Sequence, residues 1–283
     1  MKKINHLLQL IIIKILFLIF KIIGFKNSSN LGFLIGKIIG PVFRSKLSII
    51  NNLKKANING NYDEISTNVL GNYGRIFSEY IHLKNFRNDK LKNHISIEGK
   101  EYLEKIKKDK KRVVFISGHF NNFELMAMEI EKAGINLCAI YRPLNNPFLN
   151  IIMENIRKNH ICKNQIKKGK AGTRDLLNLF KKNFSAALMI DQRVSEGEDI
   201  DLFNRSAKTT TIPAQLVKKY GCNVVPVYIE RLKNYHFKLY FYKPVKFDDN
   251  LSHQEITLEL NKILEKMILK NPDQWIWTHD RWK

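Results

Sequence analysis

Two apolar stretches occupy the first 43 residues of the chain. Residues 7–25 read LLQLIIIKILFLIFKIIGF, with Lys14 and Lys21 as the only charged side chains. On a helix of about 100° per residue, Lys3 falls on the same side as these two lysines. The pattern predicts a membrane-anchoring helix over residues 1–25. Such a helix either spans the bilayer, with its lysines reaching the interface, or lies in the headgroup plane. The alternative is a buried helix of a soluble core.

The second stretch, LGFLIGKIIGPVF, covers residues 31–43. Gly32, Gly36 and Gly40 recur every four residues and therefore share one face of a helix. Small residues on one face permit close packing against a neighbour. The stretch predicts either an interfacial helix or a helix against the protein core.

The rest of the chain alternates between helical and strand-like patterns. Residues 44–110 are polar, with apolar positions at spacings of three and four, which predicts helices. Beyond them, strands are predicted at 113–117, 135–141, 185–190, 223–232 and 236–247, and helices at about 121–133, 148–160, 174–183, 211–220 and 253–269. This alternation predicts an α/β fold, a sheet flanked by helices. We expect a single domain over residues 26–283.

Composition adds a strong positive charge to this picture. Hydrophobic residues make up 44% and aromatic residues 11% of the chain, which excludes a disordered protein. The 48 Lys and Arg residues against 26 Asp and Glu give a net charge of +22. Such an excess predicts an acidic partner: nucleic acid, an anionic membrane, an acidic protein or a phosphorylated substrate.

The three cysteines form no disulfide framework and no metal-binding spacing. Cys138 and Cys222 lie in apolar runs and are predicted to be core thiols. Cys162 stands among lysines, which would lower a thiol pKa. A reducing compartment, facing the cytoplasm, fits this usage best.

Candidate chemistry follows the first strand of the α/β region, which ends in VVFISGHFNNFELM. His119 stands at the strand exit and Glu124 follows five residues later, in the next helix. A carboxylate there can accept the imidazole Nδ1–H, so that Nε2 acts as a base. The chain has no G-x-S-x-G motif, and Ser117 precedes the turn. The base would therefore activate a hydroxyl of the substrate. The alternative is a surface histidine at a helix start.

A set of segments in this order resembles the lipid A biosynthesis acyltransferases, the late acyltransferases of lipopolysaccharide synthesis. The matching segments are GHFNNFE (118–124), YRPLNNP (141–147), IDQR (190–193), the AKTTTIPAQL stretch (207–216) and the tail NPDQWIWTHDRWK (271–283). The resemblance extends over roughly residues 1–283. One departure is Asn204, which stands where the family has the glycine of a Phe-Phe-Gly element.

The resemblance implies an α/β fold of the glycerolipid-acyltransferase type with a mixed sheet. It also implies transfer of a fatty acyl chain from acyl carrier protein to a hydroxyacyl group of a lipid A precursor. The expected partners are acyl carrier protein, the lipid A precursor and an anionic membrane, with no nucleic acid, no cofactor and no metal. The expected location is the bacterial inner membrane, with the catalytic domain facing the cytoplasm.

Carried over residue by residue, the resemblance makes His119 the general base, with Glu124 orienting it. Asn122 is a candidate donor to the oxyanion that forms during transfer. These assignments imply a direct reaction without a covalent enzyme intermediate.

Arg142, Arg157 and Asp191 also match family positions and are assigned to substrate binding. Guanidinium groups suit the phosphates of a glycolipid headgroup. The alternatives are a structural ion pair for each arginine, and a helix cap or salt bridge for Asp191. The tail tryptophans are predicted to serve packing and an amphipathic interface, and His279 a structural role.

Two other functions fit parts of the sequence. One is a member of the same family that acts on another membrane glycolipid and uses acyl-CoA. The other is a basic nucleic-acid- or membrane-binding protein without catalysis. Against nucleic acid, the basic residues are dispersed and the chain carries no RRM, KH or zinc-module signature.

Overall fold

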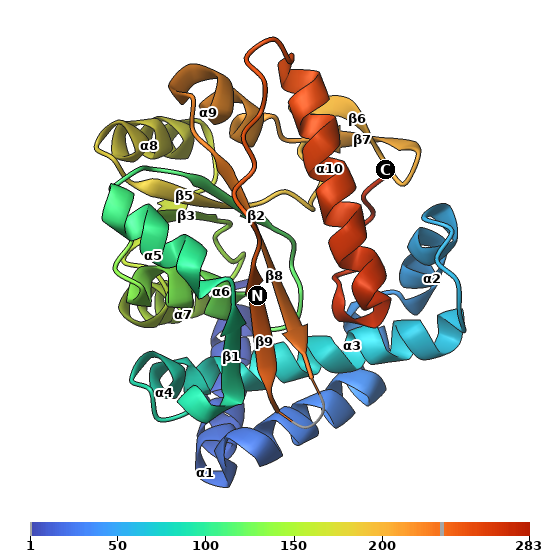
Figure 1. Ribbon diagram of the computed structural model, residues 1–283. Helices are drawn as coiled ribbons and strands as arrows, with labels where there is room; N and C mark the ends of the chain where they lie inside the picture. Colours follow the sequence, from blue (N-terminus) through green and yellow to red (C-terminus); the bar gives the residue numbers. More distant parts are fainter. Residues whose placement is uncertain (1, 233–234) are drawn as a thin grey trace.

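A seven-stranded sheet flanked by helices forms the centre of the protein (Figure 1). The computed structural model describes residues 2–232 and 235–283. Met1, the first residue of the predicted anchor, and residues 233–234 of the predicted 26–283 domain lie outside the described residues. The predicted α/β fold with a mixed sheet and an apolar N-terminal helix is confirmed.

The large sheet has the strand order β1-β9-β8-β2-β5-β3-β4. All neighbouring pairs in it are parallel except β8 and β9, so the sheet is mixed. Strands β6 and β7 form a separate antiparallel hairpin. The bounds are β1 Ile95–Glu98, β2 Val114–Ser117, β3 Leu137–Tyr141, β4 Asn164–Lys167, β5 Ser185–Met189, β6 Glu198–Leu202, β7 Arg205–Thr209, β8 Val224–Arg231 and β9 Phe237–Phe241.

Helices cover both faces of this sheet and form the N-terminal part of the molecule. Their bounds are α1 Lys2–Phe43, α2 Lys46–Lys55, α3 Tyr62–Glu79, α4 Leu83–Arg87, α5 Lys100–Asp109, α6 Glu124–Lys132, α7 Pro147–His160, α8 Lys170–Lys181, α9 Ile212–Tyr220 and α10 His253–Lys270, with 3₁₀ turns at Tyr80–His82, Lys92–His94 and Pro272–Gln274. Local sequence explains several starts. A capping box of Ser252 and Glu255 begins α10, and the Asn146 side chain caps α7 ahead of Pro147.

Three pairings were missed by the sequence patterns. Strand β1 lies inside the region predicted to be helical, and β4 and the β6–β7 hairpin were not predicted. These strands are four or five residues long and mostly polar, so their own residues carry little strand signal. The hairpin turn places Phe203 and Asn204 at φ values of 54° and 55°. This left-handed region favours glycine and tolerates asparagine, which explains how Asn204 replaces the family glycine.

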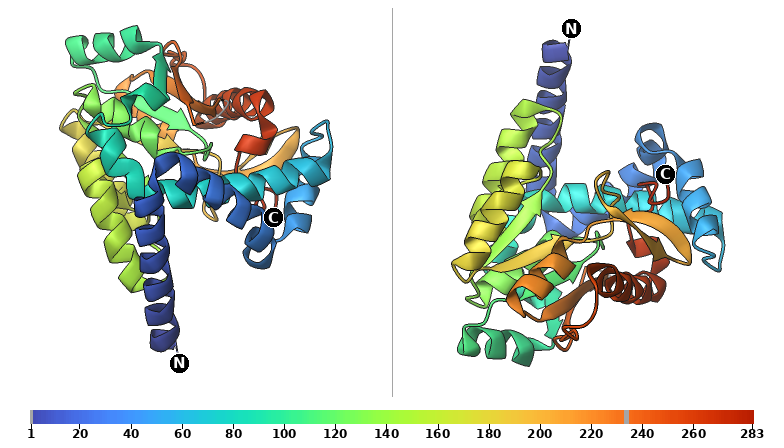
Figure 2. Two further views of the ribbon diagram at one scale, coloured as in Figure 1. Left: turned by 90° about the horizontal axis from the view of Figure 1, so that it is seen from below. Right: turned by 90° about the horizontal axis from the view of Figure 1, so that it is seen from above.

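Helix α1 bends at Gly24, which has a φ of 78°. Its first half projects beyond the rest of the molecule (Figure 2) and is held to α7 by the Asn146 side chain. That amide donates to the carbonyl of His6 and to Gln9 Oε1, both at 2.9 Å. The outer surface of this half is apolar, and Ile22 is 74% exposed. By length and composition α1 is able to cross a membrane.

The second half of α1 packs closely against α3. A side chain on Gly36 would collide with the carbonyl oxygen of Leu70, and one on Gly74 of α3 would collide with the carbonyl of Gly32. The close packing predicted from the glycine repeat is confirmed. The segment was predicted to be either an interfacial helix or a helix against the protein core. Its glycine face packs against the protein, whereas Ile38 and other apolar side chains on it are exposed.

The cysteines all lie in the interior. Cys138 and Cys222 are buried core thiols, as predicted. Cys162 is also buried, and burial raises the pKa of its thiol to about 12. The prediction of a lowered pKa for Cys162 is therefore wrong.

Candidate active site

The register between β2 and β5 brings two polar residues together at the carboxyl edge of the sheet. Ser117, the last residue of β2, lies opposite Met189 of β5. The pairing continues one step further, where the Ile190 N–H donates to the Ser117 carbonyl at 3.0 Å. His119 and Asp191 each follow two residues after the paired strand ends, so they emerge side by side. Reactive groups of α/β proteins collect at this edge.

Three donors surround the Asp191 carboxylate. Its Oδ1 lies 2.8 Å from His119 Nδ1. Its Oδ2 accepts the backbone N–H of His119 at 2.7 Å and Trp275 Nε1–H at 2.8 Å. The Asp191 side chain is 0% exposed, whereas that of His119 is 18% exposed. Asp191 therefore fixes the His119 backbone and ring from the buried side, while part of the imidazole is exposed.

Charge and burial oppose each other in this pair. Burial alone would lower the pKa of His119, but the carboxylate and hydrogen bond of Asp191 outweigh it, so the pKa is raised above 6.5. Burial alone would raise the pKa of Asp191, but His119 and the other donors hold it below its usual value. The carboxylate is therefore ionised at neutral pH, and it favours the neutral tautomer with hydrogen on Nδ1. Nε2 is then a base.

Glu124 hydrogen-bonds to other residues than the predicted His119. Its Oε1 accepts Arg157 Nε–H at 3.0 Å and the hydroxyl of Tyr80. Arg157 Nη2 also donates to the Tyr80 hydroxyl at 3.0 Å. The predicted hydrogen bond between Glu124 and His119 is wrong, because Asp191 takes that place. Glu124 remains close enough to raise the pKa of His119 by its charge.

The substrate-binding roles predicted for Arg157 and Asp191 need the same correction. The Arg157 side chain is 15% exposed and is neutralised by Glu124, which is the ion pair considered as its alternative. Burial would lower the pKa of Arg157, but Glu124 and Tyr80 raise it above its usual value. Asp191 has no exposed surface to offer a substrate.

Asn122, the predicted oxyanion donor, is buried and belongs to an internal network. Its Nδ2 donates to Glu79 Oε2 at 3.1 Å. Arg231 of β8 pairs with the same carboxylate at 2.8 and 2.9 Å, and Ser29 of α1 donates to it at 2.6 Å. Since Asn122 has no exposed surface, it holds the loop after β2 in place rather than facing a substrate.

The model of the bacterial lipid A biosynthesis acyltransferase family matches residues 4–283.

The chain belongs to this family.

The chain has low sequence identity to curated proteins of known name. The chain is 23% identical over 201 residues to the lipid A biosynthesis palmitoleoyltransferase of Escherichia coli strain K12, covering 69% of this chain and 63% of that protein. It is 26% identical over 201 residues to the lipid A biosynthesis lauroyltransferase of the same strain, covering 65% and 60%. A lipid A biosynthesis acyltransferase of Haemophilus influenzae is 26% identical over 211 residues, covering 69% and 62%. The chain thus spans less than two thirds of the length of these relatives.

The C-terminal tail contacts the loop that carries His119. Phe120 forms an isolated bridge with Trp275, and the Asn121 N–H donates to the Gln274 carbonyl at 3.1 Å. Trp277 is buried, as expected for a packing residue. Trp275 also packs in the interior, but its contact with Asp191 makes it part of the site. Sequence analysis missed this contact, although the tail motif was the signal that could have indicated it.

Arg142 is the one predicted binding arginine that stays available. It lies exposed just after β3, and it has no hydrogen bond or ion pair with the described residues. A contact between Arg142 and substrate therefore stays a prediction.

No serine or cysteine side chain hydrogen-bonds to His119 among the described residues. Ser117 Oγ turns back to the Gly118 carbonyl, at 3.3 Å, and the three cysteines are buried. No group of metal-ligating side chains occurs in residues 2–232 and 235–283. The imidazole of His119 has the ring of Phe123 edge-on at 4.7 Å.

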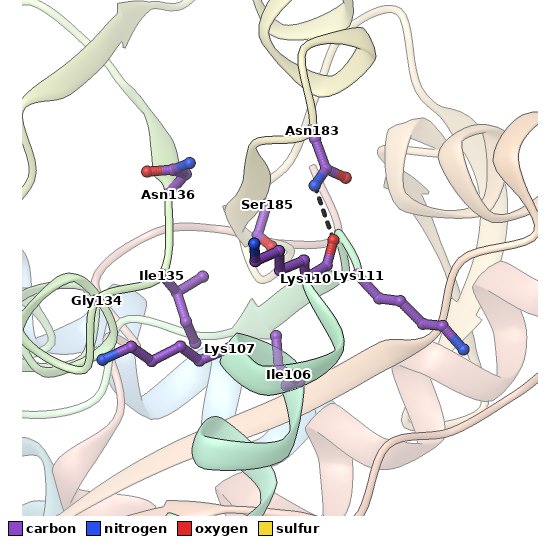
Figure 3. Close-up of a pocket in the computed structure, with 9 residues that line it drawn as sticks. All are labelled: Ile106, Lys107, Lys110, Lys111, Gly134, Ile135, Asn136, Asn183 and Ser185. Carbon is purple, nitrogen blue, oxygen red and sulfur yellow. Dashed lines mark hydrogen bonds between the residues drawn. The ribbon is translucent and has the colours of Figure 1, made fainter.

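A cavity of about 330 Å³ (Figure 3) lies at the amino edge of the sheet, opposite the edge that carries His119. Lys107, Lys110 and Lys111 line it together with Ser185, the first residue of β5. Because His119 stands at the carboxyl edge and this cavity at the amino edge, the cavity is not the site of the proposed chemistry.

Proposed function

We propose that this protein transfers a fatty acyl chain from the thioester of acyl carrier protein to a hydroxyl group on a hydroxyacyl chain of a lipid A precursor. The observation that carries the proposal is the partly exposed imidazole of His119, 18% exposed, hydrogen-bonded to the buried and ionised Asp191. The family membership supports the reaction class. The relatives' names support lipid A as the substrate class.

In this mechanism His119 Nε2 removes the proton of the acceptor hydroxyl as its oxygen attacks the thioester carbonyl. The new C–O bond forms, and the C–S bond then breaks. The thiolate that leaves takes the proton back from the imidazolium, so charge and protons balance. Asp191 stabilises the imidazolium between these two steps. General-base help of this kind supplies about 10² to 10⁴ in rate.

The proposal needs no covalent intermediate on the protein. In the described structure no serine hydroxyl or cysteine thiol hydrogen-bonds to His119, so the hydroxyl that the base activates in this proposal is the acceptor's own. The net charge of +22 favours approach of an acidic carrier protein and of an anionic membrane surface. We place the reaction at the cytoplasmic face of the inner membrane.

Mass spectrometry of the lipid product tests the function. Membranes containing the protein receive carrier protein loaded with a saturated acyl chain and a tetra-acylated precursor that carries inner-core sugars. We expect one added acyl mass, absent from membranes without the protein. Transfer from acyl-CoA to another glycolipid, and not to this precursor, would assign the protein to a different substrate. No transfer with any pair would refute an acyltransferase.

Membrane attachment by α1 gives a second test. Deletion of residues 2–23, the part before the Gly24 bend, removes most of the exposed apolar surface of α1. We expect the shortened protein to move from the membrane fraction to the soluble fraction, as measured by ultracentrifugation of lysed cells. The matched control replaces Lys14 and Lys21 with Gln, which keeps the apolar surface and the membrane fraction. Unchanged membrane association of the deletion would show that residues 31–43 or the basic surface anchor the protein.

A further inference from the structure

Two arginines near Asp191, Arg193 and Arg281, form no ion pair with an acidic side chain in the described structure. Arg281 of the C-terminal tail is 1% exposed. Its Nη1 donates to the Lys208 carbonyl and its Nη2 to Thr209 Oγ1, both at 2.6 Å. These acceptors are neutral. A buried guanidinium is costly unless an anion compensates it.

Arg193 lies near Arg281, in the loop that follows β5. It stands two residues after Asp191, and the N–H of the next residue, Val194, donates to the Lys208 carbonyl at 3.3 Å. The carbonyl that receives Arg281 therefore also anchors the loop that carries Arg193. Within residues 2–232 and 235–283, Arg193 makes no hydrogen bond and no ion pair, and its buried Nε has no protein acceptor.

The positive charge at this point exceeds the negative charge. The nearby carboxylate of Asp191 already accepts three hydrogen bonds, one of them from the imidazole of His119. Two further buried nitrogens, Arg281 Nε and His279 Nε2, also have no hydrogen-bond partner among the described residues. Burial and the neighbouring Arg193 lower the pKa of Arg281 to about 10, against the opposing charge of Asp191.

We infer that Arg193, backed by the buried charge of Arg281, binds a phosphate group of the substrate beside His119. This inference rests on the proposed function, since both proposed substrates carry phosphate. In the lipid acceptor it belongs to the headgroup, and in the donor it links the thioester arm to the carrier protein. The inference moves phosphate binding from Arg157, which Glu124 neutralises, to arginines that have no counter-ion in the described residues.

Binding of inorganic phosphate tests the subsite without any acyl transfer. We expect phosphate to raise the thermal unfolding midpoint of the full chain in detergent. Arg193→Gln should abolish that shift. Arg174→Gln is the matched control, because Arg174 is an exposed arginine on α8 without an ion pair among the described residues. An equal shift in all three proteins would overturn the subsite.

Steady-state kinetics then distinguish the two sources of phosphate. Loss of a charge-assisted hydrogen bond corresponds to about a 10- to 100-fold weaker interaction. If the acceptor supplies the phosphate, Arg193→Gln raises the KM for the phosphorylated lipid by that factor, and removing that phosphate from the lipid cancels the difference from wild type. If the donor supplies it, the KM for the acyl carrier protein rises instead, and an acyl-pantetheine thioester without phosphate shows no difference.

The same measurements separate failure of this inference from failure of the proposed function. An unchanged KM for both substrates in Arg193→Gln, with normal transfer by the wild type, would overturn the subsite alone. A phosphate-dependent thermal shift that Arg193→Gln abolishes, in a protein that transfers no acyl chain, would retain the subsite and refute the proposed reaction.

Discussion

Replacement of His119 by alanine lowers acyl transfer by about 10²- to 10⁴-fold, because the acceptor hydroxyl loses its general base. The fold survives the change. Asp191 keeps two of its donors, the backbone N–H of residue 119 and Trp275 Nε1–H. The measurement is the initial rate of acyl transfer by purified protein in detergent, with circular dichroism and thermal unfolding as checks on folding.

A histidine away from the sheet edge provides the matched control. His253 is the first residue of α10, and His253→Ala should leave the rate near that of the wild type. Near-normal turnover of a folded His119→Ala protein would show that another group, or the substrate itself, removes the proton.

Replacement of Asp191 by asparagine should have an effect of similar size, because it reverses the imidazole tautomer. Two donors converge on Oδ2, whereas Oδ1 receives only His119 Nδ1–H. The single oxygen of an asparagine belongs where the two donors meet, so its NH₂ group faces His119 Nδ1. Nδ1 then becomes an acceptor and the hydrogen moves to Nε2, which can no longer act as a base. We expect a loss of about 10²- to 10⁴-fold.

The tautomer itself is measurable by ¹⁵N NMR of histidine-labelled protein. The wild type should show hydrogen on Nδ1 of His119, and Asp191→Asn should show it on Nε2. Glu124→Gln is the matched control, because it also turns a carboxylate into an amide, but at a residue bonded to Arg157 and Tyr80. It should keep the Nδ1 tautomer and instead lower thermal stability, since Arg157 loses its partner. The opposite pattern would restore Glu124 as the group that orients His119.

The rate should also depend on pH in a defined direction. The base is active when His119 is neutral, and Asp191 raises the pKa of His119 above 6.5. The wild-type rate should therefore rise with pH to a plateau, with a midpoint above 6.5. In Asp191→Asn the charge that raises this pKa is gone, so any residual rate should reach its plateau at lower pH. A midpoint unchanged by the substitution would contradict the electrostatic role of Asp191.

Sequence patterns located most of the secondary structure, and the reason is local. The apolar runs of β2, β3, β5 and β8 are long enough to identify buried strands. Strands β1, β4, β6 and β7 were missed because their short polar sequences become strands through their partners. The glycine repeat at 32–40 likewise predicted close packing, but only the fold showed that α3 is the partner.

The chemistry divides in the same way. Sequence alone predicted His119 as a base at a strand end, and it indicated the acyltransferase family of the chain and the apolar N-terminal helix. It chose Glu124 as the partner because Glu124 is near in sequence. In the structure the partner of His119 is Asp191, 72 residues later in the chain, because β2 and β5 pair with Ser117 opposite Met189. Strand order and register are long-range properties, and no local pattern specifies which strand end will lie beside another. The tertiary structure also shows that Glu124 neutralises Arg157 and that Arg193 and Arg281 form no ion pair with an acidic side chain among the described residues.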